Sequence, residues 1–174
     1  MTAYRADGDR FGRHRVVSPA DAMPQAASKV DNSLPIFDNE ILIDVETLNI
    51  DSASFRQMSE AAGGDPQGIA DQVQKNVASM GKQQNPVTGS GGMLLGRVAE
   101  MGPKYSNPAK LEVGDRVCTL VSLTLTPLVI ERIKTVHDSE QIDIEGKAVL
   151  FDSGVLAKIP SDMDLKTCLA LLDV

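Results

Sequence analysis

The sequence predicts a small, mainly β protein with a few helices, and three observations support this fold class. The chain has 174 residues, of which 42% are hydrophobic and 24% charged, as in one ordinary globular domain. Its second half holds several short apolar runs, separated by Gly, Pro and Asn-Pro, at the spacing typical of a barrel or a sandwich. Helical periodicity is confined to residues 52–81 and to the last stretch of the chain.

Composition excludes several classes of protein. No run approaches the roughly 18 apolar residues that a membrane span needs, and the N-terminus lacks the apolar core of a signal peptide. We therefore expect a soluble, cytoplasmic protein with no membrane partner. A net charge of -7, no basic cluster and only 3% aromatic residues argue against nucleic-acid binding. Cys118 and Cys168 have neither disulfide-scaffold nor metal-site spacing, which fits a reducing compartment.

The first elements are an irregular lead-in, residues 1–35, and a strand. Residues 15–17 of the lead-in can form a short strand. Residues 40–50 alternate as a half-buried strand does, with Asp44 and Glu46 on one face. The other face is predicted to carry Ile41, Ile43, Val45 and Thr47.

Two helices follow. After Asp51, the hydroxyls of Ser52 and Ser54 can cap a short helix that Gly63 and Gly64 end. Its apolar positions are Phe55, Met58, Ala61 and Ala62. A second helix begins at the N-cap pair Asp65-Pro66 and ends at Gly81. Its apolar face is predicted to carry Ile69, Val73, Val77 and Met80.

From Val87 onward the chain is predicted to form strands at residues 94–101, 116–125, 128–136, 141–144 and 148–159. Glu145-Gly146-Lys147 is a plausible turn between the last two. The hydroxyls of Ser122, Thr124 and Thr126 alternate on one predicted strand face, which is either solvated or lines a polar pocket.

The C-terminal stretch, residues 161–174, is predicted to begin a helix that Ser161 caps. Its apolar stripe consists of Leu165, Cys168, Leu169 and Leu172. This helix either leads into a second domain, which we favour, or docks on the barrel of its own chain.

The glycine-rich run at residues 85–92 has two interpretations. It can present backbone N–H groups to a phosphate, or it can be a tight loop in which glycine lets the backbone approach a ligand or another strand closely. A dinucleotide site needs a helix after such a loop, but residues 93–98 form a predicted strand. We therefore predict no cofactor-binding residue here. In the turn at residues 111–117, Gly114 is expected to take a positive φ and Asp115 to bond nearby backbone N–H groups.

The two histidines do not predict a metal site. Neither His14 nor His137 has a metal-ligand partner at helical or turn spacing. His137 lies in a turn-like His-Asp-Ser and is expected at the surface. His14, between Arg13 and Arg15, can interact with a carboxylate.

The order of the motifs resembles a known superfamily. The strand leading into NIDSAS, the glycine-rich loop, GRVAEMG, LEVGDRV and FDSGVLAKIPSDM look like the N-terminal half of medium-chain dehydrogenases/reductases. That half is a GroES-like β-barrel. Within the superfamily, the strings GRHRVVSP, DNEILIDVETLNIDSASF, GKQQNPVTGSGGML, GDRVCTLVSLTLTPL and EGKAVLFDSGVLAKIP resemble the family of L-erythro-3,5-diaminohexanoate dehydrogenases of lysine fermentation.

The resemblance implies domains and an activity. Residues 36–160 would form the GroES-like, substrate-side barrel, with a helical insertion near 52–81, and the Rossmann domain would be missing from this chain. The implied reaction is NAD(P)-dependent oxidative deamination of the diamino acid to 5-amino-3-oxohexanoate and ammonia. The fragment alone would be inactive, the nicotinamide would be bound mainly by the missing domain, and the full-length protein would form a homo-oligomer.

The resemblance also points to site residues. Zinc-dependent relatives carry a catalytic Cys after the first long strand and Gly-His-Glu in the glycine-rich segment, whereas this chain has neither. We therefore expect no metal and assign Asp51 as proton acceptor or holder of the cationic amine, although it could merely cap the helix. Polar groups expected around the substrate are Asn49, Ser52, Ser54, Thr88, Ser90 and Ser122. The alternative function is a non-catalytic GroES-like binding or oligomerisation module.

Overall fold

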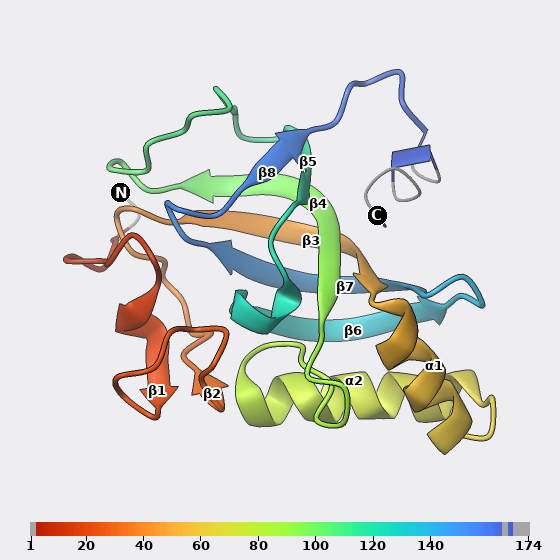
Figure 1. Ribbon diagram of the computed structural model, residues 1–174. Helices are drawn as coiled ribbons and strands as arrows, with labels where there is room; N and C mark the ends of the chain where they lie inside the picture. Colours follow the sequence, from red (N-terminus) through yellow and green to blue (C-terminus); the bar gives the residue numbers. More distant parts are fainter. Residues whose placement is uncertain (1–2, 165–166, 169–174) are drawn as a thin grey trace.

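The computed structural model describes residues 3–164 and 167–168, and it confirms a mainly β fold with a few helices (Figure 1). The strands are β1 (Val16–Ser18), β2 (Lys29–Val30), β3 (Ile41–Ile50), β4 (Gly92–Met101), β5 (Arg116–Thr119), β6 (Leu128–Val136), β7 (Gln141–Leu150) and β8 (Leu156–Lys158). The helices are α1 (Ser52–Ala61) and α2 (Pro66–Met80), with short 3-10 helices η1 (Arg13–Arg15) and η2 (Leu123–Leu125). None of the helices described is long and apolar enough to cross a membrane.

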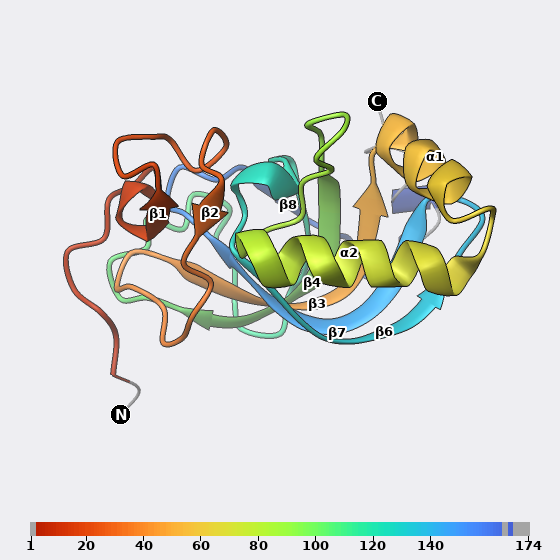
Figure 2. The same ribbon diagram turned by 90° about the horizontal axis from the view of Figure 1, so that it is seen from below.

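The main sheet has six antiparallel strands in the order β6-β7-β3-β4-β5-β8, while β1 and β2 pair separately. Among the described strands no ladder joins β6 to β8, so the sheet is curved but open (Figures 1 and 2). Helix α2 packs against β6, and α1 packs against α2. The two-helix segment therefore lies beside the sheet as an insertion between β3 and β4.

Strand β3 is nearly all buried because it sends apolar side chains into the core both before and after a register shift. Ile41, Ile43 and Val45 enter the main apolar cluster, as predicted. The register then shifts between Val45 and Thr47, so that Leu48 and Ile50 also reach this core. The prediction that Thr47 shares the core-facing side of Val45 is therefore wrong, because Leu48 and Ile50 face the core after the shift. Thr47 Oγ1 instead donates to Asp143 Oδ1 at 2.8 Å, at a surface hollow that Val45 also lines. A β-bulge is the physical reason, because one extra residue reverses the alternation.

Both helices begin at an aspartate. The Asp65 side chain accepts hydrogen bonds from Gln67 N and Gly68 N, and Gly81 ends α2 with φ 71°, as predicted. In α1 the N-cap is Asp51, whose carboxylate accepts from Ser54 N. Ser52 and Ser54 are therefore inside the helix, and the prediction that they cap it is wrong.

Several strand boundaries also differ from the prediction. The predicted strand at residues 148–159 is divided into the end of β7, at Leu150, and β8, because the chain turns between them. Strand β5 ends at Thr119, and the following residues turn into η2 with Ser122 as N-cap. The predicted hydroxyl stripe on a long strand is therefore absent. Strand β7 runs without a break through the predicted turn at Gly146. A Cβ atom at Gly146 would lie 2.3 Å from Val129 O, so glycine here allows close strand pairing instead of a turn.

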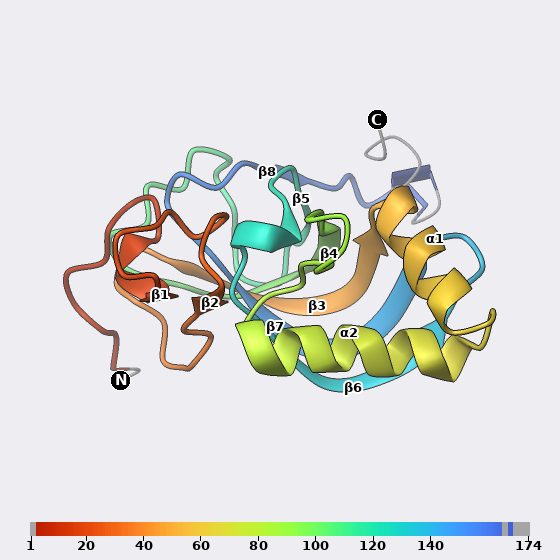
Figure 3. The ribbon, with the colours of Figure 1, turned by 60° about the horizontal axis from the view of Figure 1, so that its bottom comes forward.

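The lead-in is irregular but anchored to the sheet. The guanidinium of Arg15 is fully buried and donates to both carboxylate oxygens of Glu40, at 2.6 and 2.7 Å. The buried ammonium of Lys82, just after α2, donates to Pro24 O at 2.7 Å and Gln25 O at 3.1 Å. These contacts hold the β1-β2 ribbon beside the end of α2 (Figure 3).

The predicted C-terminal helix lies largely outside the described residues, which include neither Leu165, Leu169 nor Leu172. Cys168 is described and packs in a small apolar cluster with Cys118 and Ile159. Burial raises the pKa of the Cys118 thiol to about 11, with a contribution from Cys168. A thiol with so high a pKa is a poor nucleophile.

Candidate active site

The carboxyl end of β3, the start of α1 and the glycine-rich loop meet at a pocket of about 460 Å³. Its lining consists of Asn49, Asp51, Ser52, Ser90, Gly91, Gly92, Met93, Leu120, Val121 and Ser122. Five of the seven predicted site residues, Asn49, Asp51, Ser52, Ser90 and Ser122, are in this lining. Ser54 and Thr88 lie behind it, and hydrogen bonds connect them to Ser90.

Asp51 is the only titratable residue in that lining. Its Oδ1 accepts from Ser90 Oγ at 2.9 Å and from Ser54 N at 3.2 Å. Within the described part of the chain, Oδ2 has no hydrogen-bond donor. The half-buried carboxylate therefore both caps α1 and keeps one oxygen available for a ligand, so the two sequence interpretations of Asp51 are compatible.

A row of hydroxyl groups runs behind the carboxylate. Ser54 Oγ lies 2.6 Å from Ser90 Oγ and 2.6 Å from Thr88 Oγ1. The Ser54 side chain is fully buried, although it was predicted to surround a substrate. Its position makes it a support for Ser90 and Asp51 and keeps it away from any pocket ligand.

Asn49 and Ser122 both line the pocket, and each is held by a neighbouring side chain. Asn49 Oδ1 accepts from Gln141 Nε2 at 3.0 Å, which fixes the orientation of the buried amide. Ser122 Oγ accepts from Thr124 N at 3.2 Å and from Thr124 Oγ1 at 2.9 Å. Ser122 therefore belongs to a 3-10 cap, although the sequence placed it on a strand.

Sequence reasoning missed the role of Asn85, a fully buried residue that shapes the glycine-rich loop. Its Oδ1 accepts from Val87 N and Thr88 N, at 2.8 and 3.3 Å. Its Nδ2 donates to Gln57 Oε1 at 2.9 Å and to Ser54 O at 3.3 Å, both on α1. The Asn-Pro pair followed by Thr-Gly was the available signal, since Asn side chains commonly bond the backbone two residues on.

Glycine is required where the loop enters β4. Gly92 has φ +104°, and a Cβ atom there would lie 2.0 Å from Asn49 O and 2.9 Å from Asp51 N. Only glycine at position 92 lets the backbone of the loop come this close to the end of β3. This agrees with the tight-loop interpretation, and Figure 3 shows the loop between η2 and α1.

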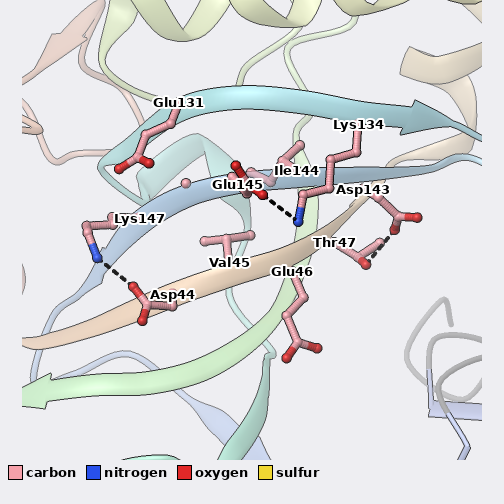
Figure 4. A pocket seen from close by; sticks show the side chains of 11 residues that line it. Asp44, Val45, Glu46, Thr47, Glu131, Lys134, Asp143, Ile144, Glu145 and Lys147 are labelled. Atoms are coloured by element: carbon pink, nitrogen blue, oxygen red, sulfur yellow. Dashed lines mark hydrogen bonds and ion pairs between the residues drawn. The ribbon is translucent and has the colours of Figure 1, made fainter.

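A second hollow, of about 430 Å³, lies over β3, β6 and β7 (Figure 4). Its lysines pair with its acids: Lys147 Nζ lies 2.6 Å from Asp44 Oδ1, and Lys134 Nζ lies 3.1 Å from Glu145 Oε1. Glu46 pairs with Arg97 and Arg116, and Asp143 pairs with His137, so most of the charge in the hollow is already matched. Glu131 is the one acid of the lining for which the described residues provide no ion pair. We therefore place the candidate site at Asp51.

The histidines are both paired with acids. His14 Nε2 lies 2.8 Å from Glu40 Oε1, and His14 Nδ1 accepts from Asp9 N at 2.8 Å, so the ring donates through Nε2. His137 Nε2 lies 2.7 Å from Asp143 Oδ2. Within residues 3–164 and 167–168, no three His, Cys, Asp or Glu side chains are grouped so that they could hold a metal ion.

Comparison with known proteins gives consistent matches. A family model described as the L-erythro-3,5-diaminohexanoate dehydrogenase N-terminal domain matches residues 14–160. Two curated proteins named L-erythro-3,5-diaminohexanoate dehydrogenase, from Acetoanaerobium sticklandii and Fusobacterium nucleatum subsp. nucleatum, are each 50% identical over 168 residues. The match covers 96% of this chain and 49% of each relative, so the chain spans about half their length. Among solved structures, the CurK enoyl reductase has a TM-score of 0.34 and 19% identity, over 72% of this chain and 28% of that one.

Proposed function

This chain belongs to the family of L-erythro-3,5-diaminohexanoate dehydrogenase N-terminal domains, and from that premise we propose that it carries the substrate-binding part of an oxidoreductase acting on an amine. The substrate we propose is the 3,5-diamino acid, which is oxidatively deaminated to 5-amino-3-oxohexanoate. The observation that carries this proposal is the half-buried Asp51 carboxylate, with one oxygen left open at a pocket otherwise lined by amide, hydroxyl and apolar groups.

The chemistry of a diamino acid suits this pocket. The substrate presents an ammonium group on the carbon to be oxidised, and Asp51 Oδ2 can accept a hydrogen bond from that group. The neighbouring polar groups of Asn49, Ser52 and Ser122 can orient the rest of the chain. A neutral pocket would bind such a cation poorly, because an unpaired charge loses its hydration on entry.

The first chemical step is a proton transfer. Asp51 takes one proton from the ammonium and leaves the neutral amine, whose carbon can release a hydride. The resulting iminium ion adds water and gives the ketone and ammonium. Overall, a protonated amine and water give a ketone, ammonium, one hydride and one proton, so Asp51 must pass on one proton in every turnover.

The pocket fits part of a nicotinamide cofactor. Met93, Leu120 and Val121 form an apolar edge beside Asp51, and Leu120 is 50% exposed. When bound, a nicotinamide dinucleotide would accept the hydride. The glycine-rich loop leads into β4 instead of a helix, so it lacks the helix N-terminus that binds a pyrophosphate. We assign the phosphates, and the choice between NAD and NADP, to residues outside those described.

The experiment compares Asp51→Asn with Asp65→Asn in the full-length protein. Both aspartates cap a helix, but Asp65 lies at the start of α2 and is not among the residues lining the pocket. We expect Asp51→Asn to lower kcat/KM for the diamino acid by roughly 10² to 10⁴. Asp65→Asn should leave kcat/KM unchanged, and both variants should keep Tm near that of wild type, because Asn caps nearly as well as Asp.

The measurement is steady-state kinetics at saturating cofactor together with thermal unfolding. A folded Asp51→Asn enzyme with near-normal kcat/KM would remove Asp51 from the mechanism. A wild-type protein that oxidises other amines but not the diamino acid would leave the reaction class intact and refute the substrate.

A further inference from the structure

We propose that Ser90, Ser54 and Thr88 form a proton relay from Asp51 to solvent, an inference that rests on the proposed role of Asp51. The four side chains form one continuous row. Ser90 Oγ donates to Asp51 Oδ1 at 2.9 Å, and Ser54 Oγ lies 2.6 Å from both Ser90 Oγ and Thr88 Oγ1. Each of these separations is within the range of a direct O–H···O hydrogen bond.

Asp51 sets the direction in which the hydroxyl groups of the row donate their hydrogen bonds. A carboxylate only accepts, so Ser90 must donate to it; Ser54 can then donate to Ser90, and Thr88 to Ser54. The proton that Oδ2 takes from the ammonium comes to face Ser90 when the carboxyl group of Asp51 turns about Cβ–Cγ and its two oxygens exchange places. The O–H then donates to Ser90, and every hydroxyl can turn outward. Serine and threonine hydroxyls, each with one proton and two lone pairs, permit both states.

Burial gives the row a defined exit. Asp51 and Ser90 are half-buried, Ser54 is fully buried and Thr88 is exposed. A substrate in the pocket covers the open side of Asp51, which then cannot exchange protons through the pocket mouth. Thr88 is exposed and does not line the pocket, so its hydroxyl offers a second route to solvent.

The loop is built to keep this spacing. Asn85 bonds Thr88 N on one side and Ser54 O and Gln57 Oε1 on the other, which ties the loop to α1. Loop residue Ser90 also accepts at its backbone from Asn85 N, at 2.8 Å. The amide of Asn85 thus fixes the distance between Thr88 and Ser54 without joining the row of hydroxyls.

Transfer along the row conserves atoms and charge. Asp51 gives the proton it took from the ammonium to Ser90, while Ser90 gives its own to Ser54, Ser54 to Thr88 and Thr88 to water. Three O–H bonds of the hydroxyls break and three form again, and one proton leaves. The hydroxyls then rotate back toward the carboxylate.

The test uses Thr88→Val and Thr88→Ser in the full-length protein with saturating diamino acid and cofactor. Valine has the shape of threonine without the hydroxyl, whereas serine keeps the hydroxyl. We expect Thr88→Val to lower kcat about tenfold with KM within about twofold, and Thr88→Ser to keep kcat near the wild-type value. Imidazole, a small base that can reach the exposed loop, should restore kcat of Thr88→Val in a concentration-dependent way and leave wild type unchanged.

Ser54→Ala removes the central hydroxyl and leaves only the longer direct contact of 3.3 Å between Thr88 Oγ1 and Ser90 Oγ, so it should also lower kcat, by no more than Thr88→Val. Ser59→Ala, the same substitution on the same helix, lies outside the row and should have no effect. The relay is overturned if Thr88→Val and Ser54→Ala keep wild-type kcat, or if their loss of kcat follows loss of Tm and does not respond to imidazole. Absence of turnover by wild type and Ser59→Ala would refute the proposed function and the relay together.

Discussion

Two carboxylates in this molecule, Glu40 and Asp51, both accept hydrogen bonds from neighbouring groups, yet their surroundings differ. Glu40 is fully buried, and both of its oxygens are saturated: Arg15 and His14 bind Oε1, while Arg15 and Phe37 N bind Oε2. Asp51 is half-buried, and the described residues donate only to Oδ1. A saturated carboxylate anchors the fold, while a carboxylate with one open oxygen can bind and react.

The charges around Glu40 and Asp51 differ as well. Burial alone would raise the pKa of Glu40, but hydrogen bonds from Arg15, His14 and Phe37 N outweigh it, and the pKa lies below its usual value. The cluster is therefore a closed unit that pairs a buried cation with a buried anion. Next to Asp51 the donors are neutral hydroxyl and backbone groups, which leave its negative charge for a ligand.

The largest expected effect comes from opening the closed cluster. Glu40→Gln leaves the buried Arg15 guanidinium with only the more distant, partly exposed Asp31, at 4.0 Å, as counter-charge, and should reduce the free energy of unfolding by about 3–5 kcal/mol. Urea denaturation measures this change in the free energy of unfolding. Glu145→Gln is the matched control, because Glu145 pairs with Arg132 and Lys134 at an exposed site and should change stability by at most about 1 kcal/mol. Similar losses of stability in Glu40→Gln and Glu145→Gln would show that the buried ion pair contributes no more than the exposed one.

Lys82, a buried cation held by carbonyl oxygens, should have an intermediate effect on stability. Burial lowers the pKa of Lys82 to about 8. Between about pH 8 and pH 10.5 the folded chain releases this proton while the unfolded chain keeps it, so the unfolded state binds more protons and stability rises with pH. The free energy of unfolding of wild type, relative to Lys82→Met, should therefore rise by about 1–3 kcal/mol across this window. Parallel pH profiles for the two proteins would show that Lys82 stays charged when folded.

The smallest expected effect is at the open carboxylate. Asp51→Asn keeps the α1 cap, so the free energy of unfolding should change by less than about 0.5 kcal/mol. Urea denaturation of Asp51→Asn and Glu40→Gln in parallel tests the comparison between the two carboxylates directly. A loss of several kcal/mol for Asp51→Asn would place Asp51 among the structural carboxylates.

The sequence was a good guide where one local rule decides the structure. Strand β6 has the predicted bounds. Helix α2 has them too, because its apolar periodicity agrees with the Asp-Pro signal at its start and the Gly signal at its end. The break predicted at Gly146 was wrong because glycine has two uses, turning a chain and allowing close approach, and only the neighbouring Val129 decides between them. Likewise, no local pattern reveals the register shift after Val45, which is a property of three paired strands.

The candidate site was predicted as a set of residues but not as an arrangement. Resemblance and polarity were enough to select Asp51, Ser90 and Asn49, and the structure places these three around one pocket. Burial of Ser54 could not be predicted, because it depends on the loop folding back over α1. That fold depends in turn on Asn85, whose side chain connects segments about 30 residues apart.

The central position of β3 has a consequence for synthesis of the protein. One edge of β3 pairs with β4, which ends at residue 101, but its other edge waits for β7, which begins at residue 141. At a synthesis rate of about 5–20 residues per second, that edge stays unpaired for several seconds. The waiting edge includes Ile41, Leu42 and Ile43, all buried in the finished fold, so the nascent chain passes through an interval in which an apolar strand edge is available to other chains.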